Sequence, residues 1–214
     1  MSTAFILIAA KNIRDTILDH ESELESLDRE IGDGDHYINM KRGVSTIVEM
    51  EADLAGYPPD AVLNKIGMKL LSTIGGASGP LLASFFMGMA KVLKEKGDES
   101  THTYASAFAA GVDVIRLRGK ADLGEKTMLD VLIPVSRQFT QLAADNMPVP
   151  QICTVLITTA EQGMQSTRDL IATKGRAAGL GERAIGHIDP GAKSCQLMIA
   201  AVCNLLLEAK ESLG

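Results

Sequence analysis

Apolar residues recur every three or four positions along most of the chain, which is the spacing of one face of an α-helix. Four stretches show this spacing most clearly: 62–71, 129–142, 152–164 and 197–206. Runs in which apolar and polar residues alternate, the pattern of half-buried strands, hardly occur. The pattern therefore predicts an all-α fold.

Glycine and proline gather in a few short segments between these helical stretches. In a helical protein such segments are interhelical loops, where functional side chains are commonly placed on a rigid scaffold. A polar stretch, 93–103, is predicted as a further, solvated loop. No internal repeat or long linker divides the chain, so residues 1–214 are expected to form a single domain. The glycine-rich segments are 32–34, 56–59, 75–80, 119–124, 175–181 and 186–191.

Composition fits a globular protein and narrows its function. Apolar residues make up 46% of the 214 residues and charged residues 22%, which excludes global disorder. The formal net charge of −6 makes non-specific nucleic-acid binding unexpected. With no run of about 20 apolar residues and no basic leader, neither a membrane span nor export is expected. The three cysteines form no CxxC pair, which favours a reducing, cytoplasmic setting.

The segment DREIGDGDH, residues 28–36, carries the clearest chemical signal. Glycines on both sides of Asp33 allow a tight turn, so Asp28, Asp33 and Asp35 can converge if Asp28 ends a helix. Converging carboxylates repel one another, and a divalent cation removes that cost. Oxygen ligands without nearby cysteines favour Mg²⁺ or Mn²⁺ over Zn²⁺, and the further ligands of an EF-hand are missing. The alternative is that these aspartates only cap helices and form turns on a solvated surface.

Other loops could hold an anion beside such a cation. The sequence GGASGP, residues 75–80, precedes an apolar helix whose first N–H groups would attract phosphate, although it can equally be a plain tight turn. In GEKTM, residues 124–128, Thr127 is a candidate helix cap, and Lys126 either reaches phosphate or is solvated. The stretch 174–183 adds two arginines suited to phosphate. P-loop and dinucleotide-binding patterns are absent from the sequence.

Four blocks, LDREIGDGDH (27–36), GGASGP (75–80), GEKTM (124–128) and 174–191, together resemble the nucleotide-binding L subunits of bacterial dihydroxyacetone kinases. The resemblance runs in the same order from about residue 27 to the C-terminus. It implies a barrel of about eight antiparallel helices with the nucleotide at the rim where the loops meet. It also implies that Asp28, Asp33 and Asp35 hold two Mg²⁺ ions that bridge the diphosphate. The residues expected around ADP or ATP are His36, Asn39, Ala77, Ser78, Gly119, Thr127, Met128, Arg176, Asp189, Pro190 and Gly191.

The resemblance further implies a kinase subunit with two partners. In the version of the family linked to the sugar phosphotransferase system, bound ADP stays in place as a cofactor. A phosphohistidine protein converts it to ATP, and the γ-phosphoryl group then passes to dihydroxyacetone held on a separate K subunit. A K-type subunit and a phosphohistidine donor are therefore the expected partners, and a homodimer is expected as well.

Three departures from the family pattern leave the predicted metal ligands intact. Tyr37 stands where a small residue is common, Ala178–Gly179 replaces a hydroxyl and aromatic pair, and Glu125 stands where Asp is common. They leave open another short ketose, such as a tetrulose, as the acceptor. Two other functions stay open: a module whose nucleotide state is read by a transcriptional regulator, and a structural bundle that binds no nucleotide.

Overall fold

The computed structural model describes residues 2–76 and 78–211. Within these residues the structure consists of α-helices and two 3₁₀-helices, η1 and η2, without a strand, so the predicted all-α fold is confirmed. The helices are α1 (Thr3–Asp19), α2 (Glu21–Ile31), α3 (His36–Glu49), α4 (Glu51–Leu54), α5 (Pro59–Thr73), α6 (Ser78–Lys96), α7 (Thr101–Gly119), α8 (Leu129–Ala144), α9 (Val149–Ser166), η1 (Thr167–Asp169), η2 (Arg176–Ala184) and α10 (Pro190–Glu211).

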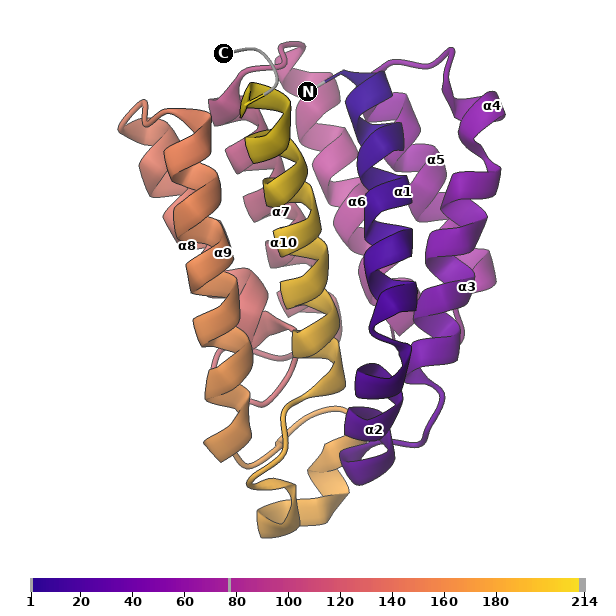
Figure 1. Ribbon diagram of the computed structural model, residues 1–214, viewed down its shortest axis with the longest axis vertical. Helices are drawn as coiled ribbons and strands as arrows, with labels where there is room; N and C mark the ends of the chain where they lie inside the picture. Colours follow the sequence, from indigo (N-terminus) through magenta and orange to yellow (C-terminus); the bar gives the residue numbers. More distant parts are fainter. Residues whose placement is uncertain (1, 77, 212–214) are drawn as a thin grey trace.

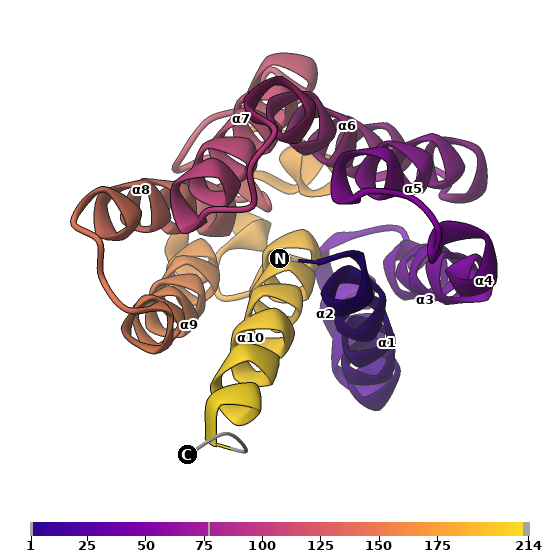
Figure 2. The ribbon, with the colours of Figure 1, turned by 90° about the horizontal axis from the view of Figure 1, so that it is seen from above.

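The long helices of the described chain form a closed ring. Helix α1 packs against α3 and α3 against α5, each helix from α5 to α9 packs against the next, and α10 returns to α1. Figure 2 shows the ring from above, down the axis that the helices surround. Figure 1 shows that neighbouring helices run in opposite directions. These eight helices are the predicted barrel, while α2 lies at one end against α3, α10 and η2.

The ring is held together by the apolar faces that the sequence pattern predicts. On α5, Val62, Leu63, Ile66 and Leu70 are buried in the core. Leu71, which the pattern placed on the same face, is 49% exposed. Successive helical residues point about 100° apart, so a residue beside a buried position lies at the edge of the face.

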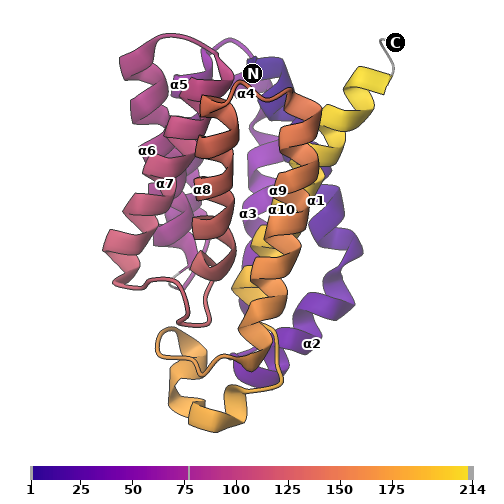
Figure 3. The ribbon, with the colours of Figure 1, turned by 90° about the vertical axis from the view of Figure 1, so that its left-hand side faces the viewer.

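One end of the ring collects most of the glycine-rich loops. The segments that follow α2, α5, α7 and η1 meet there, together with η2, at the lower end of Figure 1 and of Figure 3. Both ends of the described chain lie at the opposite end of the ring (Figure 1). The loops that carry candidate site residues therefore share one rim.

The predicted loop 93–103 is mostly wrong. Helix α6 continues to Lys96 and α7 begins at Thr101, which leaves a connection of only residues 97–100. Leu93 is buried, so the end of α6 keeps an inward face. Lys94 and Lys96 lie in its last turn, where the helix dipole favours cations.

The interior of the ring contains an apolar cavity of about 570 Å³. Helix α10 contributes Met198, Ile199 and Leu206 to its wall. Over Pro190–Ala209, α10 is long and apolar enough to cross a membrane, with a mean hydropathy of 1.3, which departs from the expectation that no segment fits a span. In this structure the helix packs along α9 and α1, and 39% of its most apolar stretch is buried.

Candidate functional site

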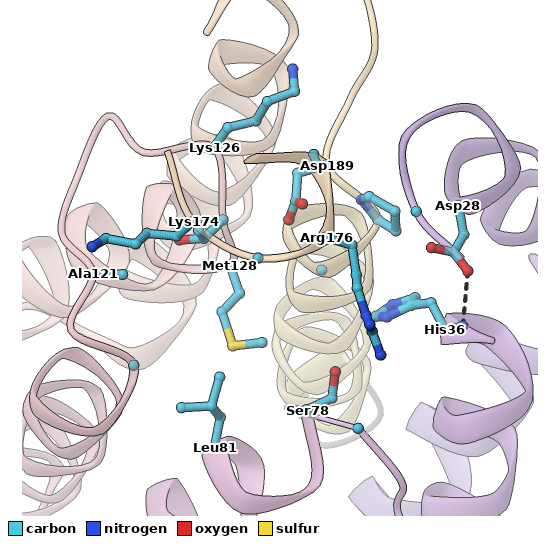
Figure 4. A pocket seen from close by; sticks show the side chains of 18 of the residues that line it. Asp28, His36, Ser78, Leu81, Ala121, Lys126, Met128, Lys174, Arg176 and Asp189 are labelled. Carbon is cyan, nitrogen blue, oxygen red and sulfur yellow. Dashed lines mark hydrogen bonds between the residues drawn. The ribbon is translucent and has the colours of Figure 1, made fainter. Parts of the chain in front are cut away.

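A pocket of about 560 Å³ lies at the rim where the glycine-rich loops meet (Figure 4). Every site residue predicted from the sequence lines it, except Ala77, which lies outside the described residues. The structure thus brings together side chains that are more than 160 positions apart in the sequence. The predicted residues in its wall are Asp28, Asp33, Asp35, His36, Asn39, Ser78, Gly119, Thr127, Met128, Arg176, Asp189, Pro190 and Gly191.

The three aspartates converge at one side of this pocket. Asp28 lies in the last turn of α2 and is buried, whereas Asp33 and Asp35 are exposed in the turn before α3. One carboxylate oxygen from each lies within 4.8 Å of the others. Asp28 Oδ2 also accepts the backbone N–H of His36 at 2.9 Å, which ties the end of α2 to the start of α3. The structure therefore confirms the prediction that these three carboxylates converge.

The electrostatics of this cluster match a cation site. Burial, a hydrogen bond with Asp33 and the charge of Asp33 together raise the pKa of Asp35, while a hydrogen bond from Asn39 opposes the shift. Asp35 therefore retains its proton more readily than an isolated aspartate, because the neighbouring carboxylates repel its charged form. A divalent cation bound by the same oxygens would remove this repulsion, so the donor set fits a hard metal ion.

His36 is held from two sides. Its ring Nε2 shares a 2.7 Å hydrogen bond with Oγ of Ser194, a buried residue of α10. Burial lowers the pKa of His36, against the opposing effect of the nearby Asp28 carboxylate, so the imidazole is neutral at pH 7. Sequence analysis did not identify Ser194, although it lies one helical turn after Pro190 on the same face of α10.

An ion pair closes one side of the pocket. Arg176 Nε, at the start of η2, lies 2.8 Å from Asp33 Oδ2. Figure 4 places the Arg176 side chain across the pocket between His36 and Ser78. The Arg176 guanidinium therefore lies beside the carboxylate cluster, and both Arg176 and Ser78, the first residue of α6, line the pocket.

The opposite side of the pocket carries mainly apolar side chains, and Lys174 extends past them there (Figure 4). Leu81, Met128 and Ala121 lie there in Figure 4, away from Asp28. Arg118 borders the same region, and its Nη1 donates to Ser84 Oγ at 3.0 Å. Sequence analysis singled out Gly119 and Met128 but missed Leu81, Arg118 and Ala121, which lie in or beside the same blocks. The pocket can hold a ligand that is apolar at one end and anionic at the other.

Asp189 lies at the centre of the pocket wall. It immediately precedes α10, and its Oδ2 accepts the N–H of Ala192 at 2.7 Å, as a helix N-cap does. Burial raises the pKa of Asp189 to about 7, the Asp130 carboxylate acts in the same direction, and Lys126 and the Ala192 N–H oppose the shift. Lys126 itself is neither solvated nor directed at the pocket centre: its side chain is only 1% exposed.

Tyr37, one of the departures from the family pattern, and His187 lie outside the pocket. Tyr37 is buried in the main hydrophobic core, so it does not cover the edge of the site. His187 Nδ1 lies 2.7 Å from Glu30 Oε2, which joins the segment before α10 to α2.

Comparisons with known proteins agree with this fold. The model of the DAK2 domain matches residues 30–204. The chain is 43% identical over 196 residues to the PEP-dependent dihydroxyacetone kinase ADP-binding subunit DhaL of Escherichia coli, covering 91% of this chain and 92% of that protein. It is 40% identical over 191 residues to the PTS-dependent dihydroxyacetone kinase ADP-binding subunit DhaL of Lactococcus lactis, covering 89% and 91%.

A solved structure has the same fold. The crystal structure of the dihydroxyacetone kinase from C. freundii in complex with AMP-PNP and Mg²⁺ superposes with a TM-score of 0.74 at 25% identity. The match covers 94% of this chain but only 34% of that one, so this chain spans about a third of the larger kinase. On the length of the family match and the identity to the two subunits, the chain belongs to the DAK2 domain family.

Proposed function

We propose that this chain is the ADP- and ATP-binding subunit of a phosphoenolpyruvate-dependent dihydroxyacetone kinase. The observation that carries the proposal is one pocket with a carboxylate cluster at one end and an apolar wall at the other. A magnesium nucleotide has the same division, with its base at one end and its metal-bound phosphates at the other. The two relatives named as ADP-binding subunits, which match over about nine-tenths of their length, support the same function.

In this proposal Asp28, Asp33 and Asp35 hold magnesium, with two ions as the finer expectation. Magnesium held by these three carboxylates would neutralise phosphate charge. Asp28 is anchored by the N–H of His36, and the other two carboxylates are carried by the short turn that follows α2. The protein therefore presents oxygen ligands from a pre-formed loop.

The remaining residues divide between phosphate and base. The Arg176 guanidinium and the Ser78 hydroxyl can donate hydrogen bonds to phosphate oxygens, and Arg176 exchanges its ion pair with Asp33 for the nucleotide. The base is placed against Leu81, Met128 and Ala121. Phosphoryl transfer needs charge neutralisation and alignment more than covalent chemistry, so these residues bind and orient without a nucleophile of their own.

We infer that the acceptor sugar is held by a separate K-type subunit and that a phosphohistidine protein of the sugar phosphotransferase system recharges the bound ADP. The names of the two relatives, PEP-dependent and PTS-dependent dihydroxyacetone kinase subunits, support this donor. Dihydroxyacetone as acceptor follows the same names, and a cytoplasmic location fits such a complex. The homodimer and the transcriptional regulator stay predictions, since no described contact bears on either.

Calorimetry of ADP binding with magnesium tests the site. Asp33→Asn removes one carboxylate charge from the cluster and should raise the Kd for ADP at least tenfold, on the order of 1.4 kcal/mol or more. Asp53→Asn makes the same change on exposed α4, outside the pocket, and should leave the Kd unchanged. Chelation of magnesium should weaken binding to the wild-type chain. Equal affinity of wild type and Asp33→Asn would contradict the metal-bridged site.

The transfer step is tested by reconstitution. The chain is combined with a K-type subunit, a phosphorylated phosphohistidine donor and dihydroxyacetone, and the sugar phosphate is measured. Product should form with a catalytic amount of ADP, because the nucleotide is recharged in place. A requirement for stoichiometric ATP would contradict the proposed donor, and a tetrulose used in preference would change the acceptor.

A further inference from the structure

The loop between α7 and α8 buries a lysine whose charge the proposed function does not use. Lys126 is 1% exposed and is among the largest fully buried side chains in the described chain. Its backbone has φ +60°, a left-handed conformation that is uncommon for residues other than glycine. Burying an ammonium group is costly unless strong acceptors surround it. Its acceptors therefore indicate what the charge holds in place.

Those acceptors come from two other segments of the chain. Lys126 Nζ donates to the backbone oxygen of Thr167, at the end of α9, and at 2.5 Å to that of His187, just before α10. Figure 4 shows the ammonium directed away from the pocket centre. Burial lowers the pKa of Lys126, and the carboxylates of Asp189, Asp169 and Asp130 oppose that shift because they favour its charged form. One ammonium thus joins the α7–α8 loop, the end of α9 and the start of α10.

Each of these segments is either continuous with residues that line the pocket or hydrogen-bonded to one of them. Thr167 Oγ1 accepts the N–H of Asp189 at 3.0 Å. Thr167 therefore binds both the Lys126 ammonium, through its backbone oxygen, and the backbone of Asp189, through its hydroxyl. Asp189 is followed by Pro190 and Gly191, which line the pocket. On the other side, Thr127 and Met128 continue from Lys126 itself into the pocket lining. The Lys126 ammonium therefore connects two segments of the pocket wall, Thr127–Met128 and Asp189–Gly191.

We propose that Lys126 is a positioning residue for the nucleotide: its buried ammonium holds the segment Asp189–Gly191 and the segment Thr127–Met128 at the spacing that the ligand requires, without touching it. This role rests on the proposed function, because it assumes that the pocket binds a nucleotide. It assigns Lys126 a third role, which differs from both alternatives that the sequence left open: contact with phosphate and exposure to solvent.

The test compares Lys126→Met, which keeps an unbranched apolar stem of similar length and removes the ammonium, with Lys11→Met. Lys11 also forms an ion pair, with Glu51 at 2.7 Å, but it lies on α1 outside the pocket, so it controls for the change in net charge. ADP binding is measured by calorimetry with magnesium, and adenosine binding by competition. Lys126→Met should weaken ADP at least tenfold and adenosine by a similar factor, while Lys11→Met leaves both unchanged.

The adenosine measurement separates positioning from direct contact. If Lys126 bound phosphate, its loss would weaken ADP but leave adenosine unaffected, and that result would overturn the proposal. An ADP affinity within twofold of wild type would overturn it as well. If the unaltered chain failed to bind ADP, the proposed function itself would fall, and the positioning role with it.

A second readout distinguishes positioning from a general loss of stability. The charged groups that face Asp189 are Lys126 and Asp130, and Cys195 lies close enough to sense its charge. Lys126 holds the pKa of Asp189 down, so removing its ammonium should raise that pKa. The midpoint of the pH dependence of ADP affinity that Asp189 causes should then move to higher pH. A variant that was merely less stable would keep the wild-type midpoint, and an unmoved midpoint would contradict the role.

Thr167→Val tests the same link without any change in charge. It keeps the shape of the side chain but removes the hydroxyl that accepts the N–H of Asp189. We expect a three- to tenfold loss of ADP affinity in this variant, with adenosine again affected alike. Wild-type affinity in Thr167→Val would overturn the link between Lys126 and Asp189 even if Lys126→Met does not fold.

Discussion

At Gly32 the chain turns where no side chain fits. A Cβ at this position would lie 1.8 Å from Oδ1 of Asp28 and 2.8 Å from its backbone oxygen. Gly32→Ala must therefore displace the buried Asp28 carboxylate, so we expect a loss of about 1–3 kcal/mol in stability and at least a tenfold rise in the Kd for ADP with magnesium. Thermal denaturation and calorimetry measure the two effects. Gly56→Ala, where nothing lies within 4 Å of the added Cβ, is the control.

Ser194 supports the site from α10. Ser194→Ala removes the hydroxyl that shares a hydrogen bond with Nε2 of buried His36, and an unsatisfied buried group costs about 1–3 kcal/mol. Urea unfolding should show a loss in that range. Ser106→Ala, at a half-buried position of α7 where the hydroxyl donates to the backbone oxygen of His102, should cost less than about 0.5 kcal/mol. Equal stability of the two variants would show that His36 finds another partner.

The residues that sequence analysis located and those it missed differ in what determines their position. Asp28, Asp33 and Asp35 could be predicted because local spacing around two glycines brings them together. Lys126 and Ser194 could not, because their partners, Thr167 and His36, are 41 and 158 positions away. From the sequence alone, a lysine in a glycine-rich loop is expected to be exposed to solvent. The charge of Lys126 is buried only because the segments at the end of α9 and before α10 pack around it.

Helices α8 and α9 pack closely where Gly163 meets the first turn of α8. A Cβ at Gly163 would lie 2.4 Å from the backbone oxygen of Asp130 and 3.0 Å from Cα of Val131, so the helices must move apart. Overpacking of this kind costs about 1–3 kcal/mol, and a loss of 2 kcal/mol would lower Tm by about 4–8 °C. Calorimetric scanning of Gly163→Ala tests this expectation, with Gln162→Ala on the exposed face as control.

Element boundaries were harder to predict than element type. The stretch 93–103 is rich in charged residues, yet Leu93 and Thr103 are buried, and both belong to helices whose outer faces are polar. Polar composition therefore indicated exposure and not the absence of a helix. The sequence likewise predicts residues 176–184 only as a loop, whereas they form η2, in which 3₁₀ turns are interrupted by a kink at Gly181 (φ 56°, ψ −131°). Short-range hydrogen bonds between residues three apart are compatible with such a glycine-rich sequence.

At the scale of the whole molecule, closure of the ring depends on contacts between the two ends of the sequence. Helix α10 packs against α1, and Asn12 Nδ2 on α1 donates to the backbone oxygen of Ala201 at 2.8 Å across a separation of 189 residues. No periodicity within either helix indicates this partner. Sequence patterns therefore predicted helices and inward faces, and the barrel itself came from the family resemblance and not from the patterns.

The free energy of unfolding should depend on pH through Asp189. Its pKa is about 7 in the folded chain and near the ordinary aspartate value of about 3.9 when unfolded, so between these values the folded state binds the extra proton. Stability contributed by this group is therefore present at low pH and is lost as pH rises toward 7. Asp189→Asn keeps an oxygen acceptor for the N–H of Ala192 and removes the titration.

Relative to wild type, the Asp189→Asn variant should thus gain on the order of 2 kcal/mol in unfolding free energy between pH 5 and pH 7.5. Urea unfolding without nucleotide at the two pH values measures the difference. His36, whose pKa is lowered, contributes the opposite slope, and Asp35 the same slope as Asp189, but both act alike in the two proteins and cancel. Asp53→Asn should show no such gain. A difference between Asp189→Asn and wild type that stays constant with pH would mean that the Asp189 carboxylate remains ionised in the folded chain.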